Sequence, residues 1–364
     1  MTSPEGSGKP TATAIRSELA ARGFDAVGFA PCEPIPHSAY LRQWLAEGQA
    51  GDMTWMTRGL DTRLDPTGLL PQARTLIVAG LNSYQPHPPG RGLIARYALG
   101  SDYHSLLRHR LHEVATWLET FGGHQRVCVD TSPLMEKVIA ARAGLGWQGK
   151  HTVLIHRRHG TWLLLGVIVT TLDIPPDPPA PDRCGSCQRC LQACPTRAIT
   201  APYQLDARRC LAYLSVEHQG PIPTPFRRPM GHRLFGCDDC LDVCPWNRWA
   251  QHTRETSLAA RPLPDLRDML NWDDATFRHH FRGTPIFRLK RPRWLRNLAV
   301  VLGNIGTPDD LPALHRAASD PHPLIAEHAS WAISEILARS QTSPSAQPGP
   351  ATNQPPPTET PPPS

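Results

Sequence analysis

A run of closely spaced cysteines constrains this 364-residue chain more than any other feature. Residues 184–195 read CGSCQRCLQACP, with cysteines at 184, 187, 190 and 194 and a proline after the last. This spacing is typical of bacterial two-cluster ferredoxins. Three thiolates on one tight loop can reach three irons of one [4Fe-4S] cluster, whereas the fourth, on the next helical turn, points to the neighbouring cluster. The spacing therefore predicts two clusters.

A second set of cysteines supplies the remaining ligands. It consists of Cys210 and the segment Cys237-x-x-Cys240-x-x-x-Cys244-Pro245, in which one loop cysteine is missing and Cys210 is the natural replacement. By the crossover rule of two-cluster ferredoxins, we predict that cluster 1 is held by Cys184, Cys187, Cys190 and Cys244, and cluster 2 by Cys194, Cys210, Cys237 and Cys240.

Zinc is the alternative metal that paired Cys-x-x-Cys motifs could bind. The Cys-Pro ending occurs twice, however, which fits cubane clusters and has no role in a zinc ribbon. Two further cysteines, Cys32 and Cys128, lie outside the pattern. Cys128 alternates with valines in an expected strand, so we predict a buried structural thiol there.

Composition places the chain in the cytoplasm. About 40% of the residues are apolar, yet no apolar run approaches the roughly 18–20 residues of a membrane span. The first residues lack the apolar core of a signal peptide. Cytosolic thiols stay reduced, so clustered cysteines indicate metal binding. The net charge of +6 permits a polyanionic partner without requiring one. We expect a monomer with no membrane association.

The order of apolar segments predicts a multidomain α+β protein. Residues 11–175 form an expected α/β domain, with helices near 11–23, 37–56, 104–122 and 135–146, strands near 26–30, 73–83 and 125–133, and a hairpin over 151–170. Residues 176–260 form the ferredoxin-like domain. Residues 261–338 contain helix pairs that are expected to stack as repeats. Residues 1–10 and the proline-rich segment 339–364 are expected to be disordered.

Several stretches besides the cysteines resemble epoxyqueuosine reductases, the cobalamin-dependent enzymes of queuosine synthesis in tRNA. They read RYALGSDYH (96–104), VDTSPLMEKVIAARAGLGWQGKHTVLI (129–155), YLSVEHQGPIP (213–223), GHRLFGCDDCLDVCPWN (231–247) and RNLAVVLGNIG (296–306). The resemblance covers about residues 15–335. It implies a cobalamin-binding α/β domain, a ferredoxin-like domain and a HEAT-like helical domain. The implied reaction converts the epoxide of epoxyqueuosine, at the tRNA wobble position, into the alkene of queuosine.

Such a reaction needs an acid, because the opened oxygen must gain protons. The family places its proton donor at the position of Asp130, which follows the strand RVCV and precedes TSPLMEK. A carboxyl beside a bulky corrin would be desolvated, which raises its pKa. In the alternative reading Asp130 caps the helix that begins near Pro133, although Thr131 or Ser132 could do this equally well. Glu136 is expected to form a structural pair or to cap that helix.

Other polar residues of these motifs are predicted to contact cofactors. The set consists of Arg96, Tyr97, Asp102, Tyr103, His104, Lys150, His151 and Glu217. For Lys150 and His151 we expect contacts to cobalamin amides or tRNA phosphate. A strong axial ligand would oppose reduction of cobalt, so we do not expect His104 to bind the metal. In the alternative reading Ser101 or Asp102 starts a helix that has His104 in its first turn.

A basic stretch near the C-terminal helices predicts the tRNA contact. Residues 278–296 carry six arginines, one lysine and two histidines but no acidic residue, and aromatic residues interleave with them. Basic side chains bind phosphates, and aromatic rings stack on unpaired bases. The predicted contacts are Arg288, Lys290, Arg291, Arg293 and Arg296. The alternative is a solvated helix face above ordinary core aromatics.

Two other functions compete with this one. A reductive dehalogenase would share cobalamin and two clusters, but the basic stretch and the missing secretion signal argue against a small free substrate. A simple electron carrier would not need the large α/β domain. The sequence does not identify the external electron donor.

Overall fold

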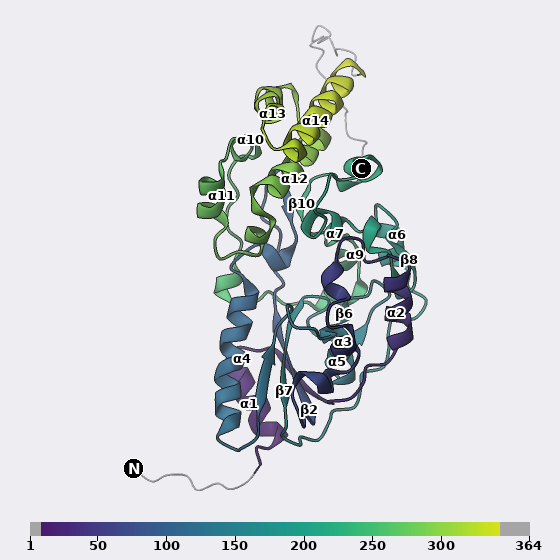
Figure 1. Cartoon of the computed structure of the whole chain (residues 1–364), viewed down its shortest axis with the longest axis vertical. Helices are drawn as coiled ribbons and strands as arrows, with labels where there is room; N and C mark the ends of the chain where they lie inside the picture. The colour runs from purple at the N-terminus through teal and green to yellow at the C-terminus, as the bar shows by residue number, and fades with distance from the viewer. Residues whose placement is uncertain (1–8, 343–364) are drawn as a thin grey trace, which may run out of the picture.

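The structure is a computed structural model that describes residues 9–342 (Figure 1). The predicted disorder of residues 1–8 and 343–364 lies outside the described residues. The C-terminal boundary predicted at residue 339 is wrong, because helix α14 (Pro323–Thr342) continues past it. Within the described part of the chain, no helix is both long enough and apolar enough to cross a bilayer.

The N-terminal domain is built on a four-stranded sheet with strand order β1-β2-β7-β4. Its strands are β1 (Ala26–Pro31), β2 (Thr75–Asn82), β4 (Gln125–Cys128) and β7 (Leu163–Thr170). Every neighbouring pair is antiparallel. The two central strands, β2 and β7, are rich in Leu, Ile and Val and are buried almost throughout, which shows that both faces of the sheet are covered.

Helices cover the two faces of this sheet (Figure 1). One face packs against α1 (Ala12–Ala21) and α4 (Tyr103–Glu119). The other face packs against α2 (Ser38–Ala46), α3 (Leu60–Leu64) and α5 (Glu136–Arg142). These elements confirm the expected strands and most of the expected helices. Cys128 is fully buried in β4, as predicted for a structural thiol.

Two sequence expectations in this domain are wrong. The helix expected over 37–56 ends at Ala46, because Gly48 and Gly51 adopt positive φ angles of 67° and 58° that a helix does not allow. The hairpin expected over 151–170 is reduced to a single antiparallel bridge between His156 and Gly160. Instead β6 (Leu154–Ile155) pairs with β5 (Trp147–Gln148), while β7 pairs with β2 and β4.

The cysteine-rich segment contains short elements. Its helices are α6 (Arg189–Ala193), α7 (Leu211–Val216), α8 (Thr224–Met230) and α9 (Asp239–Asp242), and its strands are β8 (Ile199–Ala201), β9 (Gln204–Leu205) and β10 (Arg233–Phe235). Strand β10 pairs in parallel with β3 (Leu93–Ile94) of the N-terminal domain. This pairing links the two domains directly.

The C-terminal segment is helical, with α10 (Leu266–Met269), α11 (Asp274–Phe281), α12 (Lys290–Ile305) and α13 (Leu311–Ala318) leading to α14. Helix α12 packs against α14 and also against α8 and β10. Apolar side chains of the cysteine-rich segment and of these helices form one core. The helices therefore brace the cysteine-rich segment rather than standing apart from it. The HEAT-like character of this helical segment stays a prediction.

Candidate active site and cluster pockets

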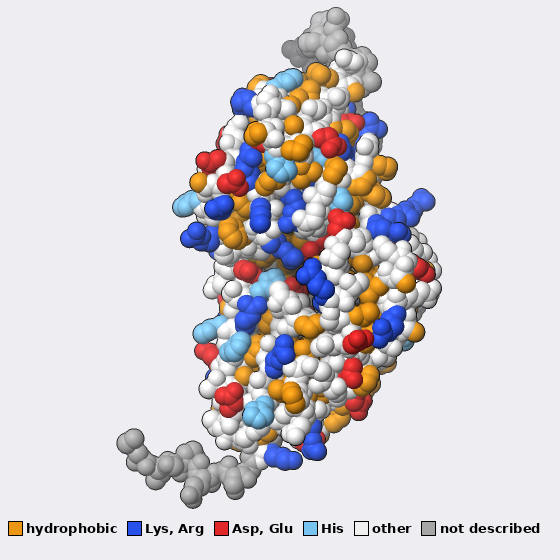
Figure 2. Space-filling model, viewed as in Figure 1, with side chains coloured by type: hydrophobic (Ala, Val, Ile, Leu, Met, Phe, Trp, Pro, Cys, Tyr) orange, Lys and Arg blue, Asp and Glu red, His pale blue; other side chains and the backbone are white. Residues whose placement is uncertain are grey.

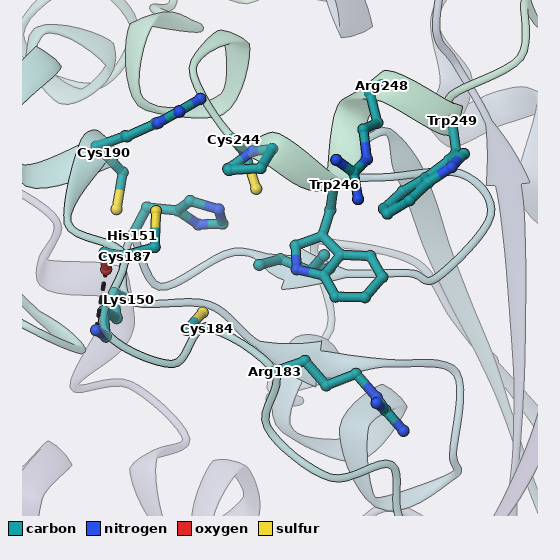
Figure 3. Close-up of a pocket in the computed structure, with 13 residues that line it drawn as sticks. Lys150, His151, Arg183, Cys184, Cys187, Cys190, Cys244, Trp246, Arg248 and Trp249 are labelled. Carbon is teal, nitrogen blue, oxygen red and sulfur yellow. Dashed lines mark hydrogen bonds between the residues drawn. The ribbon is translucent and has the colours of Figure 1, made fainter.

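The four cysteines predicted for cluster 1 line one pocket (Figure 3). Cys184, Cys187 and Cys190 come from the loop that enters α6, and Cys244 comes from the end of α9, which packs against α6. The pocket has a volume of about 280 Å³. The fold thus brings the distant Cys244 to the first loop, as the crossover rule requires.

The four cysteines predicted for cluster 2 also come together. Burial raises the pKa of the Cys240 thiol well above its ordinary value, and the neighbouring thiols of Cys210, Cys237, Cys194 and, last, Cys190 of the other group add to this rise. Thiols that affect one another in this way lie close in space. The chain therefore places two groups of four thiols side by side, which is the donor set that two cubane clusters need.

The structure corrects the roles expected of Lys150 and His151. The Lys150 ammonium donates hydrogen bonds to the carbonyls of Gly185 at 2.6 Å and Cys187 at 2.9 Å, and so fixes the first cysteine loop. His151 is buried and lines the same pocket. Both side chains line the cluster 1 pocket and are not among the lining residues of the cavities at Asp130.

A larger cavity lies between the sheet domain and the cysteine-rich segment. It has a volume of about 410 Å³ and is lined by Asp130, His104, Glu217 and Cys237 among others. Two further cavities, of about 300 and 520 Å³, adjoin it. The 300 Å³ cavity shares Asp130 with the 410 Å³ cavity, and the 520 Å³ cavity in turn shares lining residues with the 300 Å³ cavity. Together the three form one cleft, and Asp130 lines two of its three parts.

Asp130 is the first of three polar side chains that are linked by hydrogen bonds. Its Oδ2 lies 2.9 Å from His104 Nε2, and His104 Nδ1 lies 2.6 Å from Asp102 Oδ1. The Tyr103 ring stacks on the His104 ring with a centroid distance of 4.0 Å. Asp102 also accepts from the His104 backbone N–H, and so caps α4. The expected helix start at this point is confirmed, and His104 faces two carboxylates.

The charges in this chain place a proton on His104. Burial alone lowers the pKa of the His104 imidazole, but its hydrogen bonds to Asp102 and Asp130 outweigh burial and raise the pKa to about 9. Burial raises the pKa of the Asp130 carboxyl, yet the hydrogen bond and charge of His104 hold it below its ordinary value. Among the protein's own groups the pair therefore stores its proton on the imidazole, and the raised pKa expected for Asp130 beside a bound corrin stays a prediction.

This assignment predicts how stability depends on pH. The raised pKa of His104 stabilises the folded protein. This stabilisation is fully present below pH 6.5 and is lost as the pH rises through about 9. We expect the unfolding free energy of the wild-type protein to fall more steeply across this window than that of His104→Gln. Chemical unfolding of both proteins at several pH values measures the difference. Parallel curves would show that His104 is not protonated in the folded state.

The backbone at Asp130 is strained and keeps the carboxylate out of the following helix. Asp130 has a φ angle of 51°, and the Thr131 N–H donates to the Val129 carbonyl in a tight γ-turn. The reading of Asp130 as a helix cap is wrong, because α5 begins at Glu136 with Met135 at its cap position. Glu136 accepts from the Asp130 backbone N–H at 2.6 Å, which confirms the structural role expected of it.

The remaining cofactor candidates divide into two groups. Tyr97, Tyr103, His104 and Glu217 line the cavity at Asp130. Arg96 is not among the lining residues, because its guanidinium is held in ion pairs with Asp238, which does line the cavity, and with Asp242. The expectation for Arg96 is corrected on this ground.

Sequence reasoning missed several residues that line the cavity. They are Trp55, Lys137, Trp162 and Asp238. Lys137 follows Glu136 and Asp238 follows Cys237, so the motifs that contain them offered a signal. For Trp55 and Trp162 the sequence offers none, because nothing local tells a cavity-lining tryptophan from a core one.

The basic residues predicted to contact tRNA fall into an exposed group and a buried or half-buried group. Arg288 lies 3.0 Å from Glu217 and lines the cavity, and Lys290 is exposed. Arg291 binds Asp320 and the Trp272 carbonyl, and Arg293 binds backbone carbonyls. Arg296 is fully buried. The expected tRNA contacts of Arg291, Arg293 and Arg296 are corrected, because their guanidinium groups are committed to holding the fold together.

Arg296 gives a stability prediction. Its guanidinium donates to the carbonyls of Leu214, His218 and Gly220 from inside α12. Replacing it with methionine would leave these buried acceptors unpaired, each at a cost of about 1–3 kcal/mol. We expect Arg296→Met to lower the free energy of unfolding by about 3 kcal/mol or more in chemical unfolding. Lys290→Met, an exposed control, should leave stability unchanged. Equal stabilities would contradict the structural role.

The surface beside the cavity carries the remaining basic side chains. Lys and Arg side chains gather where the C-terminal helices meet the sheet domain (Figure 2). Exposed members of the stretch there are Arg278, Arg282, Arg288 and Lys290.

Fold and site define an iron–sulfur oxidoreductase with a separate reaction cavity. Residues 183–247 match the family model described as a 4Fe-4S double cluster binding domain, which favours clusters over zinc. Residues 63–131 match the model described as epoxyqueuosine reductase QueG. The chain is 44% identical to the epoxyqueuosine reductase of Xanthomonas campestris, over 90% of this chain and 97% of that protein. It is 38% identical to that of Vibrio cholerae, over 88% and 90%. The chain belongs to the epoxyqueuosine reductase family.

Solved structures agree with this assignment. An epoxyqueuosine reductase crystallised with an epoxyqueuosine-modified tRNA-Tyr stem loop superimposes with a TM-score of 0.82 at 29% identity, and each chain is covered over 89%. The enzyme from Bacillus subtilis, with an aspartate catalytic loop swung out of its active site, gives a TM-score of 0.81 at 28% identity, over 89% of this chain and 90% of that one. Family membership disfavours the dehalogenase and electron-carrier readings.

Proposed function

We propose that this protein reduces epoxyqueuosine to queuosine at the wobble position of tRNA. One observation carries the proposal. The cavity that holds the Asp130–His104 pair is also lined by Cys237, a predicted ligand of cluster 2. Electrons and protons can therefore reach one enclosed space. The reaction consumes two electrons and two protons, and it yields an alkene and water.

The cleft fits cobalamin. The part of the cleft at Asp130 combines apolar side chains such as Leu163 and Leu165 with polar ones from Tyr97 and Tyr103. These residues would hold the corrin between the sheet domain and the cysteine-rich segment. Bound cobalamin supplies a cobalt centre that can deliver two electrons to an epoxide carbon. His104 would not serve as a ligand to the cobalt, because both of its ring nitrogens face the carboxylates of Asp102 and Asp130.

The chain's own residues supply protons and position. Asp130 is the proposed donor to the opened oxygen, and His104 replaces its proton from the imidazole side. The Glu217–Arg288 pair borders the same cavity, where Arg288 can meet a phosphate or the modified base. The exposed basic residues beside the cavity would hold the anticodon loop through its phosphates. A cytoplasmic monomer fits this role.

A direct assay tests the proposal. The protein, reconstituted anaerobically with iron, sulfide and cobalamin, is incubated with epoxyqueuosine-containing tRNA and a chemical reductant. Mass spectrometry of the digested nucleosides should show conversion to queuosine with the loss of one oxygen. Unchanged epoxyqueuosine, with both clusters and cobalamin present, would refute the proposed function.

A further inference from the structure

The cluster 1 pocket opens on a face that carries exposed basic side chains. Three arginines on its rim, Arg183, Arg189 and Arg248, are exposed. None of them forms an ion pair with another residue in the described range 9–342. Most other arginines of the chain are paired with carboxylates or carbonyls. This face therefore carries positive charge that the fold itself does not use.

The acidic residues nearest the pocket are already engaged. Asp182 accepts from the Cys184 backbone N–H and from the Tyr203 hydroxyl. Asp242 is paired with Arg96. Asp182 keeps its negative charge beside Arg183, but the rim still carries three arginines against this one carboxylate, so the face stays positive and suits a negatively charged surface.

An aromatic anchor stands within this charged rim. The Arg248 guanidinium lies over the Trp249 ring at 3.8 Å, and Trp249 is 45% exposed. The Trp249 ring lies 5.0 Å from that of Trp246, which packs on the buried Trp147 at 4.8 Å. Figure 3 shows Trp246 between the Cys244 side of the pocket and Trp249. Exposed tryptophan and arginine in a rigid stack are typical anchors of protein interfaces.

A groove extends this face. It has a volume of about 830 Å³ and shares Arg189, Arg248 and Cys244 with the pocket of cluster 1. Arg288 and Lys290, the basic residues proposed for tRNA, line neither cavity. The groove can accept a loop of a partner directly beside a cluster ligand.

The two clusters have different neighbours, and this sets a direction. Cluster 2 borders the reaction cavity through Cys237, whereas no cluster 1 cysteine lines that cavity. Cluster 1 instead borders the arginine rim. Electrons that enter at the rim would pass from cluster 1 to cluster 2 and then into the cavity.

We infer that the rim formed by Arg183, Arg189, Arg248 and Trp249 is the docking surface for a small acidic protein that carries single electrons. At each encounter the reduced partner loses one electron and cluster 1 gains one. Two encounters supply the pair needed for one alkene. The inference rests on the proposed clusters, but it concerns electron supply and not the tRNA reaction.

Reduction kinetics test this inference, with reduced flavodoxin as the acidic one-electron probe. In the reconstituted protein we measure cluster bleaching by stopped-flow absorbance, together with flavodoxin affinity at several salt concentrations. Arg189→Glu/Arg248→Glu should slow bleaching by flavodoxin at least about tenfold and should flatten its salt dependence, because charge complementarity governs encounter rates. Bleaching by dithionite and the iron content should change less than about threefold.

Two further proteins make the result decisive. Arg74→Glu/Arg228→Glu changes the net charge equally at exposed sites away from the cysteines and should behave as wild type. If the Glu variant fails to assemble its clusters, Arg189→Gln/Arg248→Gln takes its place. This variant should be bleached by flavodoxin at a rate between those of the wild type and of a charge-reversed rim. Wild-type bleaching by flavodoxin in the rim variants would overturn the inference. So would a selective loss of affinity for the tRNA stem loop, since the rim would then be a nucleic-acid surface.

Discussion

Replacing Asp130 with asparagine should reduce the turnover of epoxyqueuosine-containing tRNA about 10²–10⁴-fold, the usual contribution of a positioned general acid. The amide keeps the size of the side chain and can still accept from His104, but it cannot pass on a proton. Cobalamin absorbance and iron content should stay at wild-type values. Single-turnover assays by nucleoside mass spectrometry measure the effect.

Glu136→Gln is the matched control for this substitution. Burial raises the pKa of Glu136 to about 8, so this carboxyl is a rival proton source in the same cavity. Its structural role needs only an acceptor for the Asp130 backbone N–H, which glutamine retains. We expect Glu136→Gln to keep most of the activity. If Glu136→Gln lost turnover while Asp130→Asn kept it, the donor assignment would be reversed.

Removing Cys240 should abolish turnover. This thiol belongs to the proposed cluster 2, the only cluster with a ligand on the cavity wall among the described residues. In Cys240→Ala we expect the iron content to fall from about eight to about four per chain, since each cluster needs four protein ligands. Cluster 1 should still be reduced by dithionite, but its electrons would not reach the cavity.

Cys128→Ala provides the comparison for Cys240→Ala. Cys128 is fully buried in β4 and lies outside both cysteine groups. Its loss should lower stability slightly and leave iron content and turnover near wild type. Queuosine formation by Cys240→Ala at a wild-type rate would remove cluster 2 from the electron path.

The cysteine groups could be predicted from sequence because ferredoxin spacing encodes local geometry. Loop length and the following helical turn fix where each thiol points, and the structure brings Cys244 to the first loop as expected. Asp130 and His104 were each singled out, yet their contact joins residues 26 positions apart. Sequence spacing does not encode such a contact. The assignment of the proton to His104 depends on this contact and could not be predicted without it.

The errors over charged side chains share one physical cause. A charged residue reads the same in sequence whether it meets solvent or buried carbonyls. Arg296 satisfies three backbone acceptors of the 214–220 segment, and Lys150 satisfies two in the first cysteine loop. Both needs arise from tertiary packing. The expected hairpin over 151–170 shrinks to one bridge between His156 and Gly160 for a similar reason, because β7 pairs with the buried strand β2 and with β4.

An anaerobic reductive titration tests the central claim most directly. The reconstituted protein with bound epoxyqueuosine-containing tRNA receives reductant in measured amounts, and queuosine is quantified at each step. Once both clusters are reduced, the account predicts one queuosine for every two further electrons, and no product when cobalamin is omitted. Queuosine formation without cobalamin, or full reduction of the clusters and cobalamin with no queuosine formed, would contradict it.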